Sequence, residues 1–365
     1  MRIIVVYASA GKGHTTAAQA IYGYLKDCRP GEHVEILDIL DKSSLLFNVS
    51  YHWGYTFLVN RAQFLWQILF WITHTRSLRF ATRKISKFLN RLNTRRFSAF
   101  LIKENFDVVI STHFLPSEIC AYLKSKRKIS SKLVTVITDF GVHDFWRCAQ
   151  TDLYVVASEF TKALLLSENV QYKSIKVLGL PADKKFFPAF NRDVLAKKLG
   201  LDSHKFTVLV CTGSFGIGKI EKVVEELSGE AQVLVVSANN KGLYSRLWAR
   251  KFPGVFVYSF VNNIEELMGV SDIMIAKPGG MTISECLCME IVPLFITAIY
   301  GQEVENINVL RRLNIGVDCR HLSPEKIKEI ILDFKAHPEK IDSLRENHKK
   351  LNRKFRVEEF CNAVC

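Results

Sequence analysis

Short runs of apolar residues alternate with longer amphipathic stretches in the first half of the chain. Ile3–Tyr7 is a continuous apolar run, and Thr15–Asp27 places Ala18, Ile21 and Leu25 on one stripe of a predicted helix. The same rhythm continues with further predicted strands at Val34–Asp38, Val108–Ser111, Leu133–Thr138 and Leu153–Ala157. Strands that alternate with helices in this way are typical of a parallel, doubly wound α/β sheet.

The strand–helix rhythm starts afresh in the second half. Its predicted strands are Phe206–Cys211, Gln232–Val236, Val255–Tyr258, Ile273–Ile275 and Val292–Phe295. Two such series predict two Rossmann-like domains that face each other across a cleft. We place the boundary near Pro181–Pro188, where two prolines flank a polar run, which gives domains of residues 1–187 and 188–365. A chain of 365 residues agrees with two domains of about 100–200 residues each.

Composition narrows the class of protein. Hydrophobic residues make up 48% and charged residues 24%, which excludes a disordered, collagen-like or coiled-coil chain. The nine cysteines are odd in number and form no Cys-x-x-Cys pair, so we expect neither a disulfide framework nor a zinc site, and a reducing cytoplasm. The chain begins directly with a predicted strand, so we expect no export signal. The longest aromatic–apolar stretch, Phe64–Ile72, is shorter than the about 20 residues that span a bilayer.

The net charge of +14 is concentrated in one segment. Between Asp41 and Glu104 there is no acidic residue, but there are eleven lysines and arginines and three of the five tryptophans. Tryptophans favour the headgroup region of a bilayer, and basic side chains favour an anionic leaflet. We therefore predict a peripheral site on the inner face of the cell membrane, with these candidate contacts: Trp53, Trp66, Trp71, Arg79, Arg83 and Lys84.

Two other interpretations of this segment stay open. It could be a solvated basic helix face whose aromatic side chains fill the core. Basic and aromatic residues together also occur in nucleic-acid-binding proteins. No DNA- or RNA-binding motif accompanies the charge here, so we expect no nucleic-acid partner.

The first candidate motif follows the first predicted strand. It contains Gly11, Lys12, Gly13 and His14, and it opens the first predicted helix. The glycines let the backbone turn sharply and expose amide groups to a ligand. The spacing fits neither a P-loop nor a dinucleotide fingerprint. His14 is a candidate general base, and its alternative role is a helix cap.

The second motif follows the predicted strand Leu133–Thr138. Asp139, His143 and Trp146 stand just beyond the carboxyl end of this strand, where α/β sheets bind ligands. We therefore expect them to line the same opening as His14. In the alternative interpretation, Asp139 caps a turn and Trp146 packs in the core.

Two more motifs lie in the second half. A glycine-rich loop, Gly213–Gly218, follows the strand Phe206–Cys211 and is positioned to hold a diphosphate through backbone amides. After Ile273–Ile275, Lys277-Pro278-Gly279-Gly280 turns the chain, and we expect a helix from Thr282 that carries Glu285 one turn later. Such a carboxylate can accept both hydroxyls of a ribose. The alternative is that Thr282 and Glu285 form a capping box.

At these motifs the sequence resembles glycosyltransferase family 28, and within it the diacylglycerol branch that contains monogalactosyldiacylglycerol synthase and the processive diacylglycerol glucosyltransferases. The matching segments run in the family's order from Ser9 to Asn306: the His14 loop, Thr138–Trp146, Gly179-Leu180-Pro181, Gly213–Gly218, Lys277–Glu285 and Gly301-Gln302-Glu303. One departure is Lys12, where the family usually has glycine.

The resemblance implies a GT-B fold, a UDP-sugar donor, inversion at the anomeric carbon, and neither a metal nor another cofactor. His14 falls at the position of the family's proposed base, with Asp139 and His143 as alternatives. The implied acceptor-side residues are Gly11, Lys12, Gly13 and Trp146. The implied donor-side residues are Gly213, Ser214, Phe215, Gly216, Lys277, Gly279, Gly280 and Thr282 for the diphosphate, Glu285 for the ribose, Phe260 and Val261 for the uracil, and Gln302 and Glu303 for the sugar.

The expected function is transfer of a hexose from a UDP-sugar to diacylglycerol at a membrane surface. The same chemistry on a polyprenyl-linked or other amphipathic acceptor is one alternative. A nucleotide-sugar epimerase of the same fold is another, and a non-catalytic sugar- or lipid-binding protein is a third.

Overall fold

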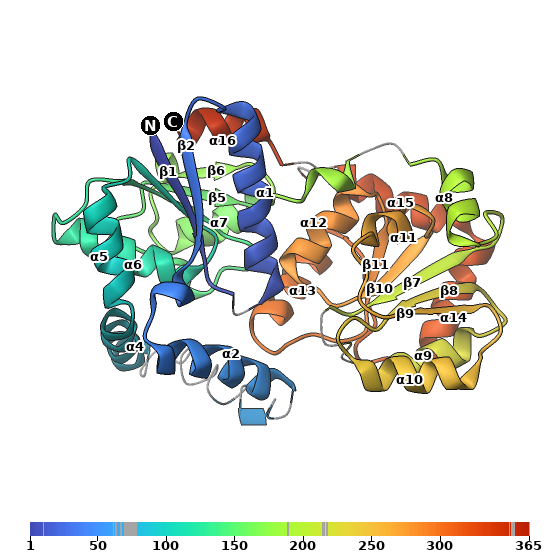
Figure 1. Ribbon diagram of the computed structural model, residues 1–365. Coiled ribbons are helices and arrows are strands. Elements are labelled where there is room, and N and C mark those ends of the chain that lie inside the picture. Colours follow the sequence, from blue (N-terminus) through green and yellow to red (C-terminus); the bar gives the residue numbers. More distant parts are fainter. Residues whose placement is uncertain are drawn as a thin grey trace. The chain divides into compact units, whose positions relative to one another are not determined.

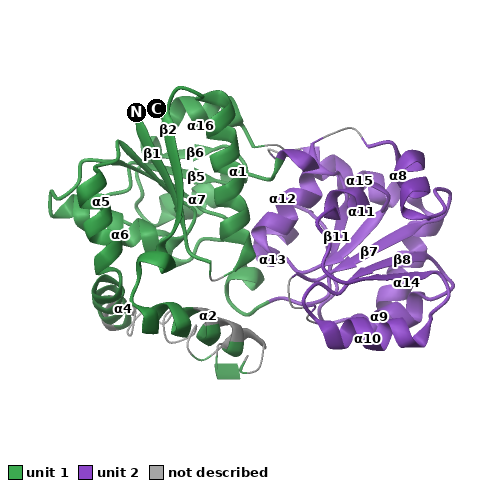
Figure 2. Ribbon diagram, in the orientation of Figure 1, with its two compact units in different colours: residues 1–183, 299–305, 354–365 green, residues 184–298, 306–353 purple. Residues whose placement is uncertain are grey.

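The computed structural model describes residues 1–9, 11–60, 62, 64–65, 68, 79–187, 190–213, 216, 218–349, 351 and 355–364. The chain forms two compact units (Figure 2). Unit 1 comprises Met1–Asp183, Ile299–Glu305 and Lys354–Cys365, and unit 2 comprises Lys184–Ala298 and Asn306–Arg353. The sequence predicted a single boundary at residue 187, whereas the chain passes between the units four times, first after Asp183.

Unit 1 is built on a parallel sheet in the order β2-β1-β3-β4-β5-β6 (Figure 1). Its strands are β1 (Arg2–Tyr7), β2 (His33–Asp38), β3 (Val108–Ser111), β4 (Lys132–Val136), β5 (Leu153–Val156) and β6 (Ile175–Val177). Its helices are α1 (Lys12–Cys28), α2 (Leu45–Asn60), α4 (Arg79–Asn93), α5 (Arg95–Glu104), α6 (Phe114–Ser125), α7 (Glu159–Ser167) and α16 (Val357–Val364). The short 3₁₀ turns η1 (Ile39–Lys42), η2 (Asp144–Trp146) and η3 (Tyr172–Ser174) join them.

Unit 2 contains a second parallel sheet in the order β12-β11-β10-β7-β8-β9. Its strands are β7 (Thr207–Cys211), β8 (Gln232–Val236), β9 (Val255–Tyr258), β10 (Ile273–Ala276), β11 (Val292–Phe295) and β12 (Val317–Asp318). Its helices are η4 (Lys184–Phe186), α8 (Arg192–Leu199), α9 (Ile220–Leu227), α10 (Lys241–Arg250), α11 (Ile264–Gly269), α12 (Gly280–Cys288), α14 (Pro324–Ala336) and α15 (Pro338–Lys349). Helix α13 (Gln302–Arg312) begins in unit 1 and continues into unit 2.

The central strands are buried on both faces, which explains why they read as continuous apolar runs. Ile3–Val6 and Val208–Val210 have no exposed surface. The predicted strands Val108–Ser111, Gln232–Val236, Val255–Tyr258 and Val292–Phe295 have the bounds expected from the sequence. The sequence missed β6 and β12, since each is an edge strand of only two or three residues.

The C-terminal helix α16 packs on unit 1. Cys361 of this helix forms a disulfide with Cys28 at the end of α1, so the expectation of unpaired cysteines is wrong for this pair. Phe355 stacks on Tyr24 of α1 with 5.9 Å between ring centroids, and Arg356 N donates to Leu178 O at 3.0 Å. The last residues of the chain therefore complete the unit that its first residues begin.

Candidate active site

The order of strands in unit 1 places three loops at one edge of its sheet. β1 lies between β2 and β3, and the chain leaves β1 toward β2 but later continues from β3 toward β4. Such a reversal opens a crevice beyond the carboxyl ends of the two central strands. The loop with His14 follows β1, Thr112 and His113 follow β3, and Thr138 and Asp139 follow β4.

His14 is fixed at this crevice through one ring nitrogen. Its Nδ1 lies 2.7 Å from Thr112 O and 3.1 Å from Thr138 Oγ1. A carbonyl oxygen can only accept, so Nδ1 carries the hydrogen and Nε2 keeps a lone pair. Thr112 Oγ1 donates to the backbone carbonyl of His14 at 2.9 Å, which ties the two loops together.

Burial sets the protonation state of His14. It lowers the pKa of His14 to about 4, because a charged imidazolium loses its hydration there, and the hydrogen bond to Thr112 only partly offsets this effect. His113 packs edge-on against His14 with 4.5 Å between centroids, and burial also lowers its pKa. His113 Nδ1 accepts from Leu115 N at 3.0 Å and caps α6. Both imidazoles are therefore neutral at physiological pH.

The glycine loop before His14 begins a helix earlier than predicted. Gly11 is the N-cap of α1, with no side-chain cap, and α1 starts at Lys12 rather than Thr15. His14 is therefore the third residue of the helix and not its cap. Lys12 is exposed at the first position, and Gly13 follows it.

Asp139 meets the segment 299–305, which belongs to unit 1. Gln302 Nε2 donates to Asp139 Oδ2 at 2.9 Å, and the Asp139 side chain is buried. Glu303 is buried as well, and its Oε2 accepts from Ile299 N at 2.7 Å. The structure thus joins Asp139 and Gln302, which the sequence assigned to different roles: Asp139 to an alternative base and Gln302 to a sugar contact.

His143 and Trp146 take structural positions. His143 Nδ1 accepts from Phe145 N at 3.2 Å and caps η2. Trp146 is fully buried in the core that contains Ile137 and Tyr154, and its ring centroid lies 6.1 Å from that of His14. Trp146 supports the His14 ring from within unit 1, which agrees with the packing alternative.

The sheet of unit 2 has a reversal point of the same kind, which is formed by different residues. β7 lies between β8 and β10. The chain continues from β7 toward β8 but from β10 toward β11, on the other side of the sheet, so the loops after Cys211 and Ala276 meet at a second reversal point. Gly213 has φ +82°, and a Cβ there would lie 2.6 Å from Lys277 Cε. The Lys277 side chain therefore passes directly over the glycine loop, to which Gly216 also belongs.

The turn after β10 presents a helix N-terminus. Gly279 is the N-cap of α12, and the helical ladder begins with Ile283 N donating to Gly279 O at 3.0 Å, so the amides of Gly280, Met281 and Thr282 have no acceptor within the helix. Helix α12 starts at Gly280 and not at Thr282, so Thr282 cannot be the N-cap of a capping box with Glu285. Asn306 Nδ2 donates to Pro278 O at 2.9 Å and fixes the turn.

The remaining predicted residues fall into three groups. Phe260 and Val261 follow β9, and Phe260 is 50% exposed. Ser214, Phe215, Trp66 and Trp71 lie outside the described residues. Arg79 and Arg83 belong to α4, and Lys84 on the same helix is exposed.

Helices α2 and α4 leave many large apolar side chains uncovered. Trp53 is 73% exposed, and the others on these two helices are Leu45, Leu46, Val49, Phe57, Ile85, Phe88, Leu89 and Leu92. We call these residues, with the exposed Lys84, the α2–α4 surface. Each of the two helices thus exposes an apolar face, and large exposed apolar faces mark interaction sites. No helix within the described ranges is long and apolar enough to cross a membrane.

Thr112 and His113 were missed by the sequence analysis. They directly follow a predicted strand, Val108–Ser111, and a polar Thr-His pair at a strand end was a usable signal. What the sequence could not supply was the pairing of β1 with β3, which brings Thr112 to His14.

Two parallel sheets, each with its candidate residues at the reversal point, are the architecture of the GT-B fold. Residues 14–182 match the family described as monogalactosyldiacylglycerol (MGDG) synthase, and residues 207–359 match the glycosyltransferase family 28 C-terminal domain. The chain belongs to glycosyltransferase family 28, with an MGDG synthase domain ahead of the family's C-terminal domain.

Several relatives extend over most of the chain. A processive diacylglycerol beta-glucosyltransferase of Bacillus pumilus is 26% identical over 97% of this chain and 91% of its own length. A protein of the same name from Staphylococcus epidermidis is 28% identical over 84% of this chain and 78% of its own length.

Solved structures agree on the fold. Acinetobacter baumannii MurG has a TM-score of 0.59 at 10% identity and covers 100% of this chain and 99% of its own. Anabaena HepE in complex with UDP has a TM-score of 0.60 at 13% identity, with coverage of 100% and 98%. A UDP-GlcNAc 2-epimerase from Neisseria meningitidis reaches 0.60 at 12% identity, again with 100% and 98% covered.

Proposed function

We propose that this protein transfers a hexose from a UDP-sugar to diacylglycerol at an anionic membrane surface, with inversion at the anomeric carbon and without a metal ion. The observation that carries the proposal is His14, a neutral imidazole whose Nδ1 is held by Thr112 O and whose Nε2 keeps its lone pair. The names of the relatives support the acceptor, and the UDP in the HepE structure supports the donor.

His14 would act as the general base. An acceptor hydroxyl must lose a proton as it attacks the sugar, and Nε2 can accept that proton while Nδ1–H stays on Thr112 O. The hydroxyl of Thr138, 3.1 Å from the same nitrogen, helps to orient the ring. A single displacement by this hydroxyl would invert the configuration of the anomeric carbon.

Unit 2 would receive the leaving diphosphate. The free amides at the start of α12 and the glycine loop after β7 are suited to negative charge, and Lys277 adds a cation over Gly213. These groups can stabilise the leaving group without a metal ion. Gly280 and Thr282 in the first turn of α12 would contact the phosphates, and Glu285 would bind the ribose hydroxyls, with Phe260 and Val261 beside the uracil.

The segment 299–305 would contact the sugar. Gln302 and Glu303 would bind its hydroxyls, and the bond between Gln302 and Asp139 makes Asp139 a positioning residue for Gln302 rather than a base. Gly11, Lys12 and Gly13 would border the acceptor hydroxyl next to His14.

The α2–α4 surface would hold the enzyme on the bilayer. Its exposed indole and aliphatic side chains suit the headgroup boundary. Its exposed Lys84, together with the exposed Arg95 and Arg96 of α5, suits anionic lipids. Diacylglycerol stays in the bilayer, so an enzyme that acts on it must meet the membrane. Binding to vesicles with and without phosphatidylglycerol should show a preference for the anionic ones that Trp53→Ala weakens.

The deciding experiment uses labelled UDP-glucose and UDP-galactose with vesicles that contain diacylglycerol. We expect a glycolipid product with the anomeric configuration opposite to that of the donor, formed equally well in EDTA, and formed roughly 10²–10⁴-fold more slowly by His14→Ala. A product only with polyprenyl diphosphate lipids would refute the acceptor, and dependence on a divalent ion would refute the metal-free mechanism.

An epimerase is the second candidate, because the Neisseria meningitidis epimerase shares the fold. It predicts isomerisation of the labelled UDP-sugar without lipid and no glycolipid product.

A further inference from the structure

The loop after β4 and the start of α13 approach each other closely at Gly141. A Cβ added to Gly141 would lie 2.7 Å from Glu305 Cβ and 3.3 Å from the backbone carbonyl carbon of Glu305. Both residues belong to unit 1. Gly141 does not have a left-handed backbone conformation, so alanine could adopt its φ without strain. Only the approach of Glu305 therefore requires a glycine at this position.

The loop that carries Gly141 is fixed from within unit 1. The Phe140 side chain is buried, and its carbonyl oxygen accepts from Thr161 Oγ1 at 2.9 Å. Thr161 is held at the start of α7, because its amide donates to Ser158 Oγ at 3.2 Å. The loop could make room for a side chain at residue 141 only by breaking these bonds and exposing Phe140. The start of α13 is therefore the part that would move.

The segment at the start of α13 is bonded to itself and would move as one piece. Glu303 Oε2 accepts from Ile299 N at 2.7 Å. Glu305 N donates to Gly301 O at 3.0 Å, which closes the first turn of the helix. A displacement of Glu305 would therefore be passed on to the rest of the segment 299–305.

Two contacts hold this segment on the loop after β4. One is the hydrogen bond of 2.9 Å from Gln302 Nε2 to Asp139 Oδ2, and the other is the packing of Glu305 on Gly141. A new Cβ at residue 141 would have to push Glu305 Cβ away by about 1 Å to reach an ordinary carbon–carbon distance. A shift of that size would stretch the bond between Gln302 and Asp139 beyond the range of a hydrogen bond.

We propose that Gly141 is a positioning residue for the hexose of the UDP-sugar. The inference rests on the proposed function, which assigns Gln302 and Glu303 to the hydroxyls of the hexose. It adds that the loop after β4, through Asp139 and Gly141, determines where these two side chains lie. The residues proposed for the diphosphate, the ribose and the uracil belong to unit 2. The binding of the nucleotide alone therefore does not depend on Gly141.

Calorimetry with UDP and with a UDP-hexose separates the two parts of the donor. The UDP-hexose is the tighter binder of UDP-glucose and UDP-galactose. For Gly141→Ala we expect its Kd to rise about threefold to tenfold, the effect of one misplaced hydrogen bond, while the Kd for UDP stays within about twofold. An unchanged Kd for the UDP-hexose, or an equal rise for both ligands, would overturn the proposal.

The matched control is Gly23→Ala in α1 of the same unit. A Cβ at Gly23 meets nothing within 4 Å. Both Kd values should therefore equal those of the unchanged chain. A selective loss of the UDP-hexose with Gly23→Ala would show that the effect of Gly141→Ala does not depend on Glu305.

A compensating change tests the steric cause. Glu305→Gly, added to Gly141→Ala, removes the nearest atom that the new Cβ would meet and leaves the next at 3.3 Å. Both Kd values should then return to within about twofold of those of Glu305→Gly alone, including any loss of folding by Gly141→Ala. Asp139→Ala removes the other contact and should selectively raise the Kd for the UDP-hexose. No recovery in the double variant would refute the close approach as the cause.

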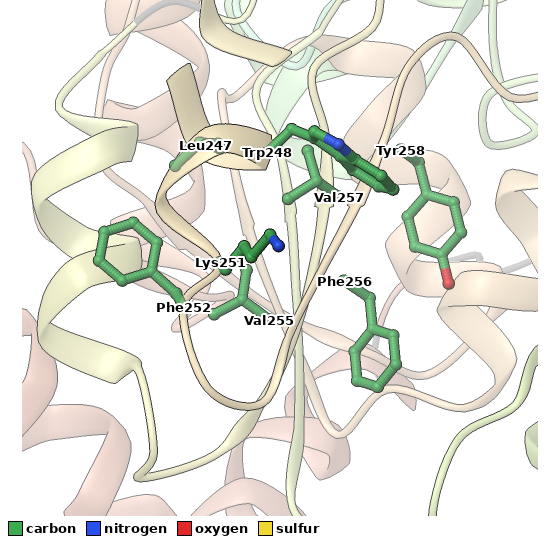
Figure 3. Close-up of a pocket in the computed structure, with 8 residues that line it drawn as sticks. All are labelled: Leu247, Trp248, Lys251, Phe252, Val255, Phe256, Val257 and Tyr258. Atoms are coloured by element: carbon green, nitrogen blue, oxygen red, sulfur yellow. The ribbon is translucent and has the colours of Figure 1, made fainter. Parts of the chain in front are cut away.

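Another place for the hexose would be an apolar pocket of about 650 Å³ beside β9 in unit 2. Aromatic side chains line it, among them Trp248, Phe256 and Tyr258 (Figure 3). A pocket of this size can hold a small ligand. Trp248→Ala should nevertheless leave both Kd values unchanged. A selective loss of the UDP-hexose with Trp248→Ala, and none with Gly141→Ala, would assign the hexose to this pocket and overturn the proposal.

These binding measurements do not involve the acceptor. A chain that binds the UDP-hexose but forms no glycolipid with diacylglycerol would refute the proposed function, whereas the comparison of the two Kd values would still decide the role of Gly141.

Discussion

The two units use the reversal points of their sheets in different ways. In unit 1 the point is filled by side chains that hold one another, with His14 between Thr112 and Thr138 and against His113. In unit 2 the corresponding point is formed mainly of backbone, with Gly213 after β7 and the start of α12 after β10. A proton acceptor needs one side chain in a controlled protonation state, whereas an anion can be held by amides that any residue supplies.

The largest effect should come from removing the side chain of His14, the proposed base in unit 1. His14→Ala is expected to slow transfer by roughly 10²–10⁴-fold, the usual contribution of a general base. UDP binding, measured by calorimetry, should be unchanged, because the residues proposed for the diphosphate, the ribose and the uracil lie in unit 2. Near-normal turnover would refute His14 as the base.

The next effect concerns the one carboxylate proposed for the donor in unit 2. Glu285→Ala should weaken UDP binding by roughly 10–100-fold, since a charged acceptor for two ribose hydroxyls contributes about 1.5–3 kcal/mol. Turnover at saturating donor should stay close to that of the unchanged chain. Equal UDP affinity of the two proteins would remove Glu285 from the site.

A smaller effect, on the KM for the donor, is expected from changing the backbone conformation of the glycine loop. Gly213→Ala should raise the donor KM by roughly threefold to tenfold, because its φ of +82° disfavours a side chain and the new Cβ would displace Lys277. Gly229→Ala is the matched control: its φ is +79° and a Cβ there meets nothing within 4 Å. Both should lose similar stability, so an equal KM for the two would contradict the loop's role.

The smallest effect is the pH dependence of transfer. With a His14 pKa of about 4, the base is deprotonated at all higher pH values, so its contribution is lost only as the pH falls toward 4. From pH 7.5 down to 5.5, kcat/KM should change by less than about twofold, whereas an ordinary histidine with a pKa of about 6.5 would cost about tenfold. A tenfold fall over this range would show that His14 is hydrated and not buried in the working enzyme.

The same comparison explains what could be predicted from the sequence. The unit 2 loops were predictable because their function depends on local residues: glycine and proline after a strand determine the turn wherever it occurs. His14 was found for the same reason. Its supporting residues, Thr112 and Thr138, stand 98 and 124 residues away in the chain, and only the order β1-β3-β4 brings them together.

Two further residues show where local patterns mislead. Trp146 follows a strand end in the sequence, but the chain returns it to the core, where its large apolar surface is covered. Gln302 stands among second-half motifs, yet it bonds to Asp139 because the first turn of α13 belongs to unit 1. Tertiary contacts, rather than propensity, determine both positions.

The return of α16 to unit 1 bears on how the protein is made. The strands of unit 1 leave the ribosome before unit 2 is made, yet Phe355 and Cys361, which contact α1, are synthesised only after unit 2. Unit 1 is therefore begun before unit 2 and completed after it. Phe355 can stack on Tyr24 only once this later segment has been made. In nascent chains stalled before residue 355, α1 should lack its contacts with α16 and should be sensitive to protease. Once α16 has left the ribosome, α1 should be protected.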